Sequence, residues 1–468
     1  MSATDLDSPA PASHAEPISP ATLDAWDLDH YWHSFTPMAG YEPLVIERGE
    51  GTTLYDIRGR SYLDAASSMW CTALGHSHPR VRRAITAQLE RVAHCTSLGM
   101  GSDVAVRLAK RLADLAPGDL TRVFFSSDGS SAVEIAMKQA VQYWRQRDDP
   151  RPRKTRFLCF GDAYHGDTIG ATAVGGIGRY YEVFGPLLCE VIRVDPPDTR
   201  RGEDPDEIAS ALARVERAFH EQADTIAAVV VEPLVQMAAG MRFHPIGFFA
   251  GVRRLCDEHD VLLIADEIAV GLGRTGRVFA CDHESLPNGE PVVPDFLCLG
   301  KHLTAGYLPM AATLTTDRVY REFLNRTPEE DRTFWHGHTF SGNALAAAAA
   351  LATLDELVDG GVLDALPEKI ARMGERLCDL AADPRVKHAR LRGMIAAFNF
   401  IPIDGGDGEA FLDEASPGRT LARYALEHGV WLRAKPDLVY LTPPLTASLS
   451  EIDRMFDVIA DGLRADHG

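Results

Sequence analysis

Two apolar runs that end in charged residues constrain the fold of this chain more than any other feature of its sequence. Residues 261–265 (VLLIA) are followed at once by Asp266 and Glu267. Five consecutive apolar residues closed by carboxylates are typical of a parallel strand that is buried on both faces and ends at a ligand site. Residues 296–299 (FLCL) form a second such run, and Lys301 follows it after a glycine. We therefore predict an open α/β sheet whose ligand lies at the carboxyl ends of these two strands.

The combination of Asp266 and Lys301 suits the chemistry of pyridoxal phosphate (PLP). In PLP enzymes a lysine forms a Schiff base with the cofactor, and a carboxylate keeps the pyridine nitrogen protonated so that the ring can act as an electron sink. Each residue also has a plainer interpretation, because buried strands often end in Asp and a lysine after glycine is usually a surface residue. The two residues together favour the catalytic interpretation.

Composition argues against several other classes of protein. The formal net charge of -20 argues against nucleic acid and anionic membranes as partners, since both attract basic patches. No stretch approaches the ~20 apolar residues of a membrane span. The eight cysteines are scattered singly, which indicates a reduced, cytoplasmic protein, and no cluster of His or Cys predicts a metal site. Residues 1–27, rich in Pro, Ala and Ser, are expected to form a flexible tail.

Two earlier strands are predicted to end near the same ligand. Residues 121–125 lead into a Ser/Gly turn that opens a helix. Gly129 and Ser130 in that turn suit either a phosphate cup, built from free N–H groups at a helix N-terminus, or an ordinary helix cap. A strand at 156–160 precedes Tyr164, whose ring suits either stacking on a planar cofactor or packing in the core.

A βαβ series joins these strands to the first apolar run. The run at 226–231 (IAAVVV) ends at Glu232, and a helix is expected at 247–259 before the next strand begins. Strands that alternate with helices in this way predict a parallel sheet covered by helices. We place this large α/β domain at residues 76–335.

The segments on either side of the large domain are expected to form a smaller α+β domain at residues 336–468, to which residues 28–75 contribute. Residues 47–64 alternate in polarity and contain Gly-Arg turns, so they predict a small antiparallel meander. An irregular stretch follows, in which Trp70 is expected to be exposed. Near the C-terminus, two apolar runs look like paired strands, and Arg433 on the first suits either a carboxylate anchor or a surface arginine.

The segment from Asp266 to Lys301 resembles the signature of the class III aminotransferases. The resemblance rests on these two residues together with Glu267, Asp295 and a turn that contains Gly271, Gly273, Arg274 and Gly276. The same glycines match G-x-G-x-x-G formally, but no strand leads directly into them and no long helix follows, so we reject a dinucleotide site. The resemblance implies the PLP-dependent transferase fold of type I, with a large, mostly parallel sheet domain and a smaller α+β domain.

The family resemblance also implies a set of site residues. Lys301 is then the catalytic residue, and Thr339 reaches the cofactor phosphate of the neighbouring subunit, which implies a homodimer with shared active sites. Asp128 departs from the family pattern, because an acid beside the phosphate cup could repel phosphate unless its side chain turns away. The implied cofactor-binding residues are Gly129, Ser130, Tyr164, Glu232, Asp266, Ile268, Lys301 and Thr339.

A finer resemblance covers residues 28–460. The leader at 32–38, the Ser-Ser-Met-Trp at 67–70 and the Glu-Pro-Leu-Val-Gln at 232–236 resemble the 7,8-diaminopelargonic acid aminotransferases of biotin biosynthesis. These enzymes transfer an amino group to 8-amino-7-oxononanoate (KAPA), so KAPA and an amino donor are the implied substrates. The implied substrate-binding residues are Phe35, Met69, Trp70, Tyr164, Gly337, His338 and Arg433.

Two details bear on the amino donor. S-adenosylmethionine users tend to have two adjacent tryptophans where this chain has Met69 and Trp70, and Gly-Pro-Thr where it has Gly337, His338 and Thr339. The Gly-His-Thr pattern, and the run from Gly176 and Ile177 to Phe184-Gly-Pro-Leu, resemble the lysine-using branch more closely. The alternatives are a broad ω-amine transaminase or another class III PLP enzyme, and a binding protein of the same fold that holds no PLP.

Overall fold

A seven-stranded sheet carries the predicted strand ends. In the computed structural model, which describes residues 18–199, 205–400 and 416–465, all of its strands are parallel except β12, which is antiparallel to both neighbours. This confirms the predicted α/β class and the mostly parallel sheet. The strands in sheet order are β4 (Arg122–Ser126), β12 (Ala311–Thr315), β11 (Phe296–Leu299), β10 (Leu262–Asp266), β7 (Ile226–Val231), β5 (Arg156–Phe160) and β6 (Val191–Val194).

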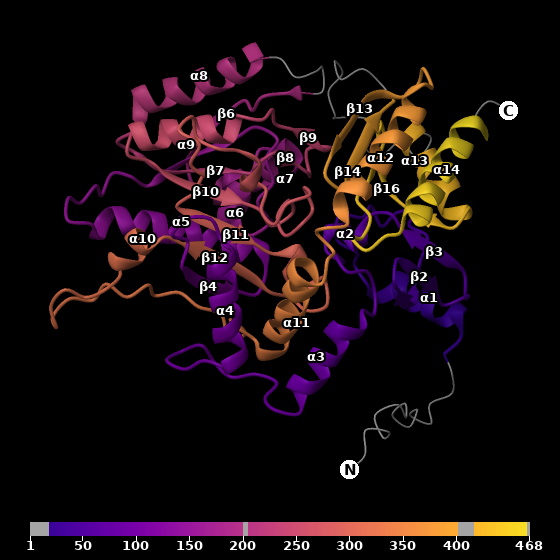
Figure 1. The fold of residues 1–468 in the computed structure, drawn as a ribbon, viewed down its shortest axis with the longest axis horizontal. Coiled ribbons are helices and arrows are strands. Elements are labelled where there is room, and N and C mark those ends of the chain that lie inside the picture. The colour runs from indigo at the N-terminus through magenta and orange to yellow at the C-terminus, as the bar shows by residue number, and fades with distance from the viewer. Residues whose placement is uncertain (1–17, 200–204, 401–415, 466–468) are drawn as a thin grey trace.

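Successive residues of the central strands are buried against opposite layers of helices. Ile264 belongs to the apolar cluster formed with α5 (Gly129–Gln146), whereas Leu263 and Ala265 belong to the cluster formed with α8 (Pro205–Gln222) and α9 (Phe248–Glu258). Figure 1 shows α8 and α9 together along one side of the sheet. Burial on both faces explains why these strands are uninterrupted apolar runs rather than alternating ones.

Shorter helices complete the first part of the chain. The remaining elements between residues 67 and 359 are α2 (Ser67–Trp70), α3 (Pro79–Leu89), α4 (Asp103–Leu115), α6 (Ile169–Val174), α7 (Gly178–Tyr181), a 3₁₀ turn (Glu182–Leu187), the pair β8 (Val235–Gln236) and β9 (Arg242–Phe243), 3₁₀ turns at Cys281–His283 and Lys301–Thr304, α10 (Asp317–Arg321), α11 (Ala344–Leu354) and a π turn (Asp355–Asp359). The alanine-rich helix α11 packs against α3 and α4, and its small side chains let these helices approach closely.

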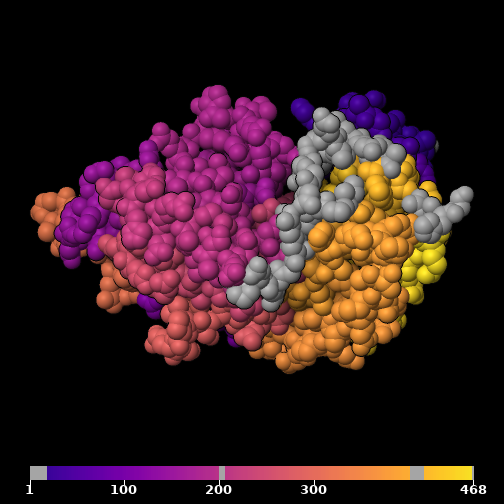
Figure 2. Space-filling view, turned by 90° about the horizontal axis from the view of Figure 1, so that it is seen from above, coloured from indigo at the N-terminus to yellow at the C-terminus, as the bar shows by residue number. Residues whose placement is uncertain are grey.

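The C-terminal residues form a second, antiparallel sheet covered by helices. Its strands in order are β13 (Lys387–Arg392), β14 (Ile395–Asn399), β17 (Leu438–Leu441) and β16 (Arg433–Lys435), and its helices are α12 (Leu366–Ala381), α13 (Pro417–Glu427) and α14 (Leu449–Ala465). The space-filling view shows these orange and yellow residues at one end of the molecule, beside the indigo N-terminal residues (Figure 2). The expected pairing of residues 429–433 with residues 438–445 holds only at Arg433, the first residue of β16, because Val430 and Trp431 pair with a strand near the N-terminus instead.

A third sheet joins the two ends of the chain. The predicted meander is present as β1 (Ile46–Glu50), β2 (Thr53–Asp56) and β3 (Ser61–Asp64), and β15 (Val430–Trp431) adds to it in parallel with β3. This contact agrees with the expectation that residues 28–75 belong with the C-terminal part. The exact boundaries, 28–75, 76–335 and 336–468, stay a prediction.

Two expectations about the N-terminal part need correction. Within the tail expected at 1–27, the structure has a helix, α1 (Pro20–His30), because Ser19 caps it and Asp24 pairs with Arg58 of the meander; residues 1–17 lie outside the described residues. Trp70, expected to be exposed, is 5% exposed. Its backbone forms a left-handed turn that directs the ring inwards, which no sequence pattern indicated.

Candidate active site

The carboxyl ends of five parallel strands surround a cavity of about 390 Å³. The cavity is lined by Gly129 and Ser130 after β4, Tyr164 and His165 after β5, Glu232 after β7, Asp266 at the end of β10 with Ile268 beyond it, and Gly300 and Lys301 after β11. The sheet thus brings together side chains that are up to 172 positions apart, and all of the predicted cofactor-binding residues except Thr339 line this one cavity.

Asp266 lies at the bottom of the cavity, held on both carboxylate oxygens. Oδ1 accepts a hydrogen bond from the Ile268 N–H at 3.0 Å, and Oδ2 is 2.7 Å from Nδ1 of the fully buried His165. Burial by itself would lower the pKa of His165, but the hydrogen bond to Asp266 and its charge raise that pKa above the ordinary value. His165 was not predicted from the sequence; the available signal was its position directly after Tyr164 at a strand end.

Lys301 faces Asp266 across the cavity. Burial lowers the pKa of its amine, while the charges of Asp266 and Glu232 oppose that shift. A lowered pKa favours the neutral, nucleophilic amine. Glu232 is itself buried, accepts hydrogen bonds from the backbone N–H groups of Tyr164 and Met237, and has its pKa raised by burial to about 7.

The N-terminus of α5 forms the opposite end of the cavity. Asp128 is its cap: the carboxylate accepts hydrogen bonds from the Ser131 N–H and from the Ser131 hydroxyl, both at 2.9 Å. The Asp128 carboxylate therefore binds the first turn of the helix with both oxygens, and the Gly129 and Ser130 N–H groups remain available to bind an anion. Gly166 permits a close approach here, because a Cβ at that position would lie 2.0 Å from Ser130 Oγ.

Aromatic side chains form the wall above Lys301. The Trp70 ring centroid is 5.4 Å from Lys301 Nζ and 6.2 Å from the ring of Tyr440. On the other side, the ring of Tyr164 is 5.9 Å from that of Tyr180. Tyr180 and Tyr440 were not predicted; each lies in a segment whose spacing indicates only a helix or a strand.

Arg433 lies directly behind this aromatic wall. It is the antiparallel partner of Tyr440 in the second sheet and is half-buried. Burial raises the pKa of the Tyr440 phenol to about 12, and the Arg433 charge opposes the shift there and at Tyr180. An arginine beside two phenols and an apolar wall is suited to bind a carboxylate at the end of an apolar chain.

Several predicted substrate residues do not line the cavity in the described chain. Met69 packs beside Trp70 in an apolar cluster, and the Phe35 ring is 5.5 Å from that of Tyr180, at the outer edge of the aromatic wall. Gly337 and His338 lie in an irregular segment near the surface, and Thr339 begins a turn at its end. Together with Arg433, these five are the predicted residues that do not line the cavity in the part of the chain that the structure describes.

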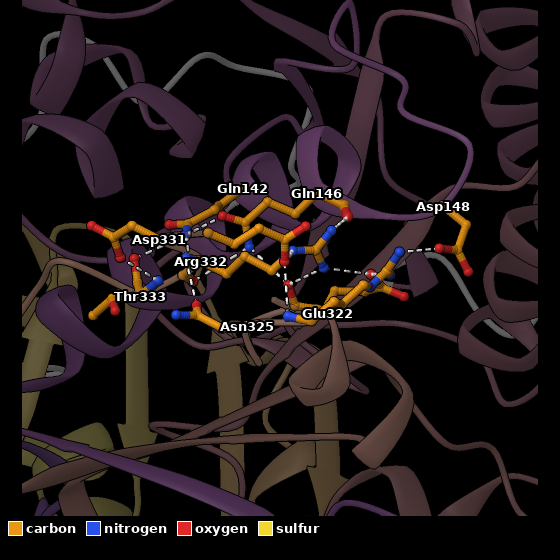
Figure 3. Close-up of polar contacts among 10 residues, drawn as sticks. Gln142, Gln146, Asp148, Glu322, Asn325, Asp331, Arg332 and Thr333 are labelled. Carbon is orange, nitrogen blue, oxygen red and sulfur yellow. Dashed lines mark hydrogen bonds and ion pairs between the residues drawn. The ribbon is translucent and has the colours of Figure 1, made fainter. Parts of the chain in front are cut away.

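A network around Arg332 fixes the start of that irregular segment (Figure 3). The Arg332 guanidinium donates to the backbone carbonyls of Gln146, at 2.7 Å, and Glu322, at 3.1 Å. The Gln142 side-chain amide in turn donates to the Thr333 carbonyl at 3.1 Å. Both glutamines are on α5, so the helix whose N-terminus is the predicted phosphate cup anchors the segment that leads to Thr339 at its other end.

Three residues of the recognised signature have structural roles. Glu267 faces away from the cavity and accepts hydrogen bonds from the backbone N–H groups of Ala280 and Cys281, and burial raises its pKa to about 7. Arg274 is fully buried, and its hydrogen-bond partners are the carbonyls of Met394 and Pro443, Ser67 Oγ and His302 Nε2. Asp295 pairs with Arg253 and Arg318. These three buried residues stabilise the segments around the site without lining the cavity.

The cavity fits PLP. Backbone N–H groups at a helix N-terminus suit its phosphate, Tyr164 suits its ring, and Asp266 suits a protonated pyridine nitrogen, with Lys301 between them. His165 Nε2 is buried and has no hydrogen-bond partner among the described residues. Within those residues no group of three or more His, Cys, Asp or Glu side chains could hold a metal ion, and no helix is long and apolar enough to span a bilayer.

The chain is similar to proteins of one family over nearly its whole length. The adenosylmethionine-8-amino-7-oxononanoate aminotransferase of Geobacter sulfurreducens is 44% identical over 93% of this chain and 96% of its own. The enzyme of the same name from Aquifex aeolicus is 41% identical over 94% and 97%.

Solved structures agree with the sequence comparisons. The enzyme of that name from Methanocaldococcus jannaschii superimposes with a TM-score of 0.84 and 37% identity, covering 95% of this chain and 99% of that one. An (S)-enantioselective ω-transaminase from Thermomicrobium roseum gives a TM-score of 0.88 and 31% identity over 96% and 99%. The family profile of the class III aminotransferases matches residues 36–463. This chain therefore belongs to the class III aminotransferases, which are PLP-dependent enzymes of fold type I.

Proposed function

We propose that this aminotransferase converts KAPA to 7,8-diaminononanoate in biotin biosynthesis. The observation that carries the proposal is the line from Lys301 along the Trp70 and Tyr440 rings to Arg433. KAPA is an apolar chain with a carboxylate at one end and an amino ketone at the other, so it matches an amine, an apolar wall and a cation in that order. The relatives named for this reaction, which share 41–44% identity with the chain, support the same substrate.

Different residues of the chain have different roles in the reaction. PLP, when bound, supplies the electron sink that stabilises negative charge at the substrate carbon. Asp266, fixed by the Ile268 N–H and by His165, holds a proton on the ring nitrogen. Lys301 Nζ, with its lowered pKa, exchanges protons with the substrate carbon, and the buried walls exclude water.

For the amino donor we propose S-adenosylmethionine, because relatives that are 41–44% identical to this chain are named for it. Lysine is the second candidate, and it is favoured by His338 between Gly337 and Thr339 and by the run from Gly176 to Leu187. The enzyme's cytoplasmic setting is part of the proposal and agrees with the free thiols of all eight cysteines. The acidic net charge gives no support for a nucleic acid or membrane partner.

The purified enzyme can be assayed with KAPA and either donor. We expect 7,8-diaminononanoate by mass spectrometry with S-adenosylmethionine, and little with lysine. Product with lysine alone would reverse the choice of donor. If pyruvate with 1-phenylethylamine turned over while KAPA did not react with either donor, the enzyme would be a broad ω-amine transaminase instead. A protein that stayed colourless with PLP would contradict the enzyme assignment altogether.

The proposal includes a homodimer in which Thr339 serves the partner's site. It is supported by the position of Thr339, which is exposed and outside the cavity of its own chain. Lys301→Ala and Thr339→Ala subunits can be mixed at limiting PLP after unfolding and refolding together. If Thr339 acts across the interface, a mixed dimer contains one intact site, and activity should rise above that of either variant. No recovery would show that Thr339 acts on its own site or not at all.

A further inference from the structure

The turn that carries Trp70 has an unusual backbone. Four consecutive residues of α2 that are not glycine have positive φ: Ser67 at 48°, Ser68 at 43°, Met69 at 66° and Trp70 at 70°. They form one turn of left-handed helix, a conformation that side chains with a Cβ disfavour. Such a turn persists when the surrounding structure holds it, and strain of this kind is often found at functional sites.

The carboxylate of Asp64 holds this turn. Its Oδ1 accepts hydrogen bonds from the N–H groups of Ala66, at 3.2 Å, and Ser68, at 3.1 Å. Its Oδ2 accepts from Ser68 Oγ at 3.1 Å and is 3.0 Å from His76 Nε2. The Asp64 side chain is fully buried, so four partners at these distances leave little freedom in the turn.

Asp56, eight residues earlier, repeats the same arrangement. Its Oδ1 accepts from the N–H groups of Arg58 and Arg60, both at 2.9 Å, and its Oδ2 accepts from Arg60 Nε and the Tyr62 hydroxyl. In both cases the backbone donors are two and four residues after the aspartate. The Asp56 carboxylate closes the turn between β2 and β3 and does not line the cavity. The chain therefore contains its own control for the effect of such a carboxylate.

The Asp64 turn differs in what it carries. Trp70, its last residue, forms the cavity wall above Lys301. Ser67, its first residue, donates from Oγ to the Thr442 carbonyl at 2.5 Å and accepts from Arg274. If the turn relaxed to a right-handed conformation with Ser67 still anchored, the Trp70 side chain would point in a different direction and leave the wall.

We propose that Asp64 is a positioning residue that holds Trp70 in the substrate wall by fixing this left-handed turn. The inference rests on the proposed function in one respect, because it takes the apolar chain of KAPA to lie against Trp70. His76 and Ser68 assist Asp64 by occupying its second oxygen. Asp64 touches neither Lys301 nor the phosphate cup, so cofactor binding should depend on it much less than KAPA binding.

The test compares Asp64→Ala with Asp56→Ala. Three measurements are made on each PLP-loaded protein: the melting temperature, the affinity for KAPA from single-turnover reactions, and the accessibility of Trp70 to acrylamide. Because the chain has six tryptophans, the Trp70 signal is taken as the difference between each protein and the same protein with Trp70→Phe. Two milder variants, Ser68→Ala and Asp64→Asn, serve if Asp64→Ala does not fold.

We expect both alanine variants to melt at lower temperature, but only Asp64→Ala to expose Trp70 and to weaken KAPA binding by about tenfold. Ser68→Ala should shift both readouts in the same direction by less. Asp64→Asn should restore most of the wild-type behaviour, because its oxygen can still accept both backbone N–H groups. Equal effects of Asp64→Ala and Asp56→Ala on KAPA affinity, or an unchanged Trp70 accessibility, would overturn the proposal. If the wild-type enzyme did not bind KAPA, the proposed function would fail. The accessibility of Trp70 to acrylamide would still decide the role of Asp64.

Discussion

The two sides of the cavity are built in different ways. On the cofactor side, Glu232, Asp266 and Lys301 each follow a strand of one sheet, and the sheet register fixes their relative positions. On the substrate side, Trp70 and Arg433 come from segments more than 350 residues apart, one a left-handed turn and the other a short strand. The cofactor side is therefore fixed by one sheet, whereas the substrate side depends on contacts between the two ends of the chain. Substitutions should affect chemistry on the first side and affinity on the second.

The largest effect is expected at Lys301. Lys301→Ala removes the amine that bonds the cofactor and moves the proton, so turnover and the visible absorbance of bound PLP should both be lost. Lys154→Met is the control: that lysine is also buried and its pKa is lowered to about 8, but it donates to backbone carbonyls far from the cavity. The Lys154→Met variant should be less stable than the wild type but should keep the visible absorbance of bound PLP. A coloured, active Lys301→Ala enzyme would contradict the assignment.

The neighbouring carboxylates Asp266 and Glu267 provide the next comparison. Asp266→Asn should still bind PLP but lose about 100-fold or more in kcat, equivalent to at least ~2.7 kcal/mol of barrier, since an unprotonated ring is a poor electron sink. Glu267→Gln changes a buried carboxylate that faces away from the cavity, so kcat should hardly change. Steady-state kinetics on both variants measures the difference. Near-normal turnover in Asp266→Asn would make that carboxylate structural.

On the substrate side the expected effect is on binding. Losing a buried, charge-assisted contact costs about 2–5 kcal/mol when its partner is left unpaired, so Arg433→Ala should weaken KAPA binding at least tenfold. The half-reaction with the amino donor should change much less. Arg433→Lys keeps the charge but loses the planar fork, and an intermediate affinity is expected. Small and equal changes in both half-reactions would identify Arg433 as an ordinary surface residue of the strand.

The smallest effect concerns pH. Burial raises the pKa of both Glu232 and Glu267 to about 7. The folded protein then holds these protons more tightly than the unfolded chain does, so this contribution to the free energy of unfolding is complete below about pH 4 and is lost as pH rises through 7. Removing either proton site, in Glu232→Gln or Glu267→Gln, should reduce the loss of stability between pH 5 and 8 by about 1–3 kcal/mol in denaturant titrations.

The two glutamates should differ in activity, which sharpens the comparison between a residue that lines the cavity and one that does not. Glu232 lines it and accepts from the Tyr164 N–H, so Glu232→Gln should alter the pH profile of turnover. Glu267→Gln should leave the profile unchanged. Identical profiles for the two variants would show that Glu232, like Glu267, has a structural role alone.

The sequence by itself determined the cofactor side of this protein. The runs before Glu232, Asp266 and Lys301 are apolar because both faces of a central parallel strand are buried, and such a strand must place the next polar residues at the open edge of the sheet. The identity of those residues was then enough to indicate PLP, and the resemblance added the family. The apolar pattern of the strands and the residue types at their ends indicated the same site, so these residues could be predicted without the tertiary structure.

Only the tertiary structure decided the rest of the site. That Trp70 is buried depends on Asp64 stabilising a left-handed turn, and the sequence around it carries no periodicity that would reveal this. That His165 supports Asp266 depends on two strand-end loops 101 residues apart in the chain. That Tyr440 packs against Trp70 and lies opposite Arg433 depends on the pairing of β16 with β17. These are contacts between distant segments, and their energies come from burial and hydrogen bonds that exist only once the chain is folded.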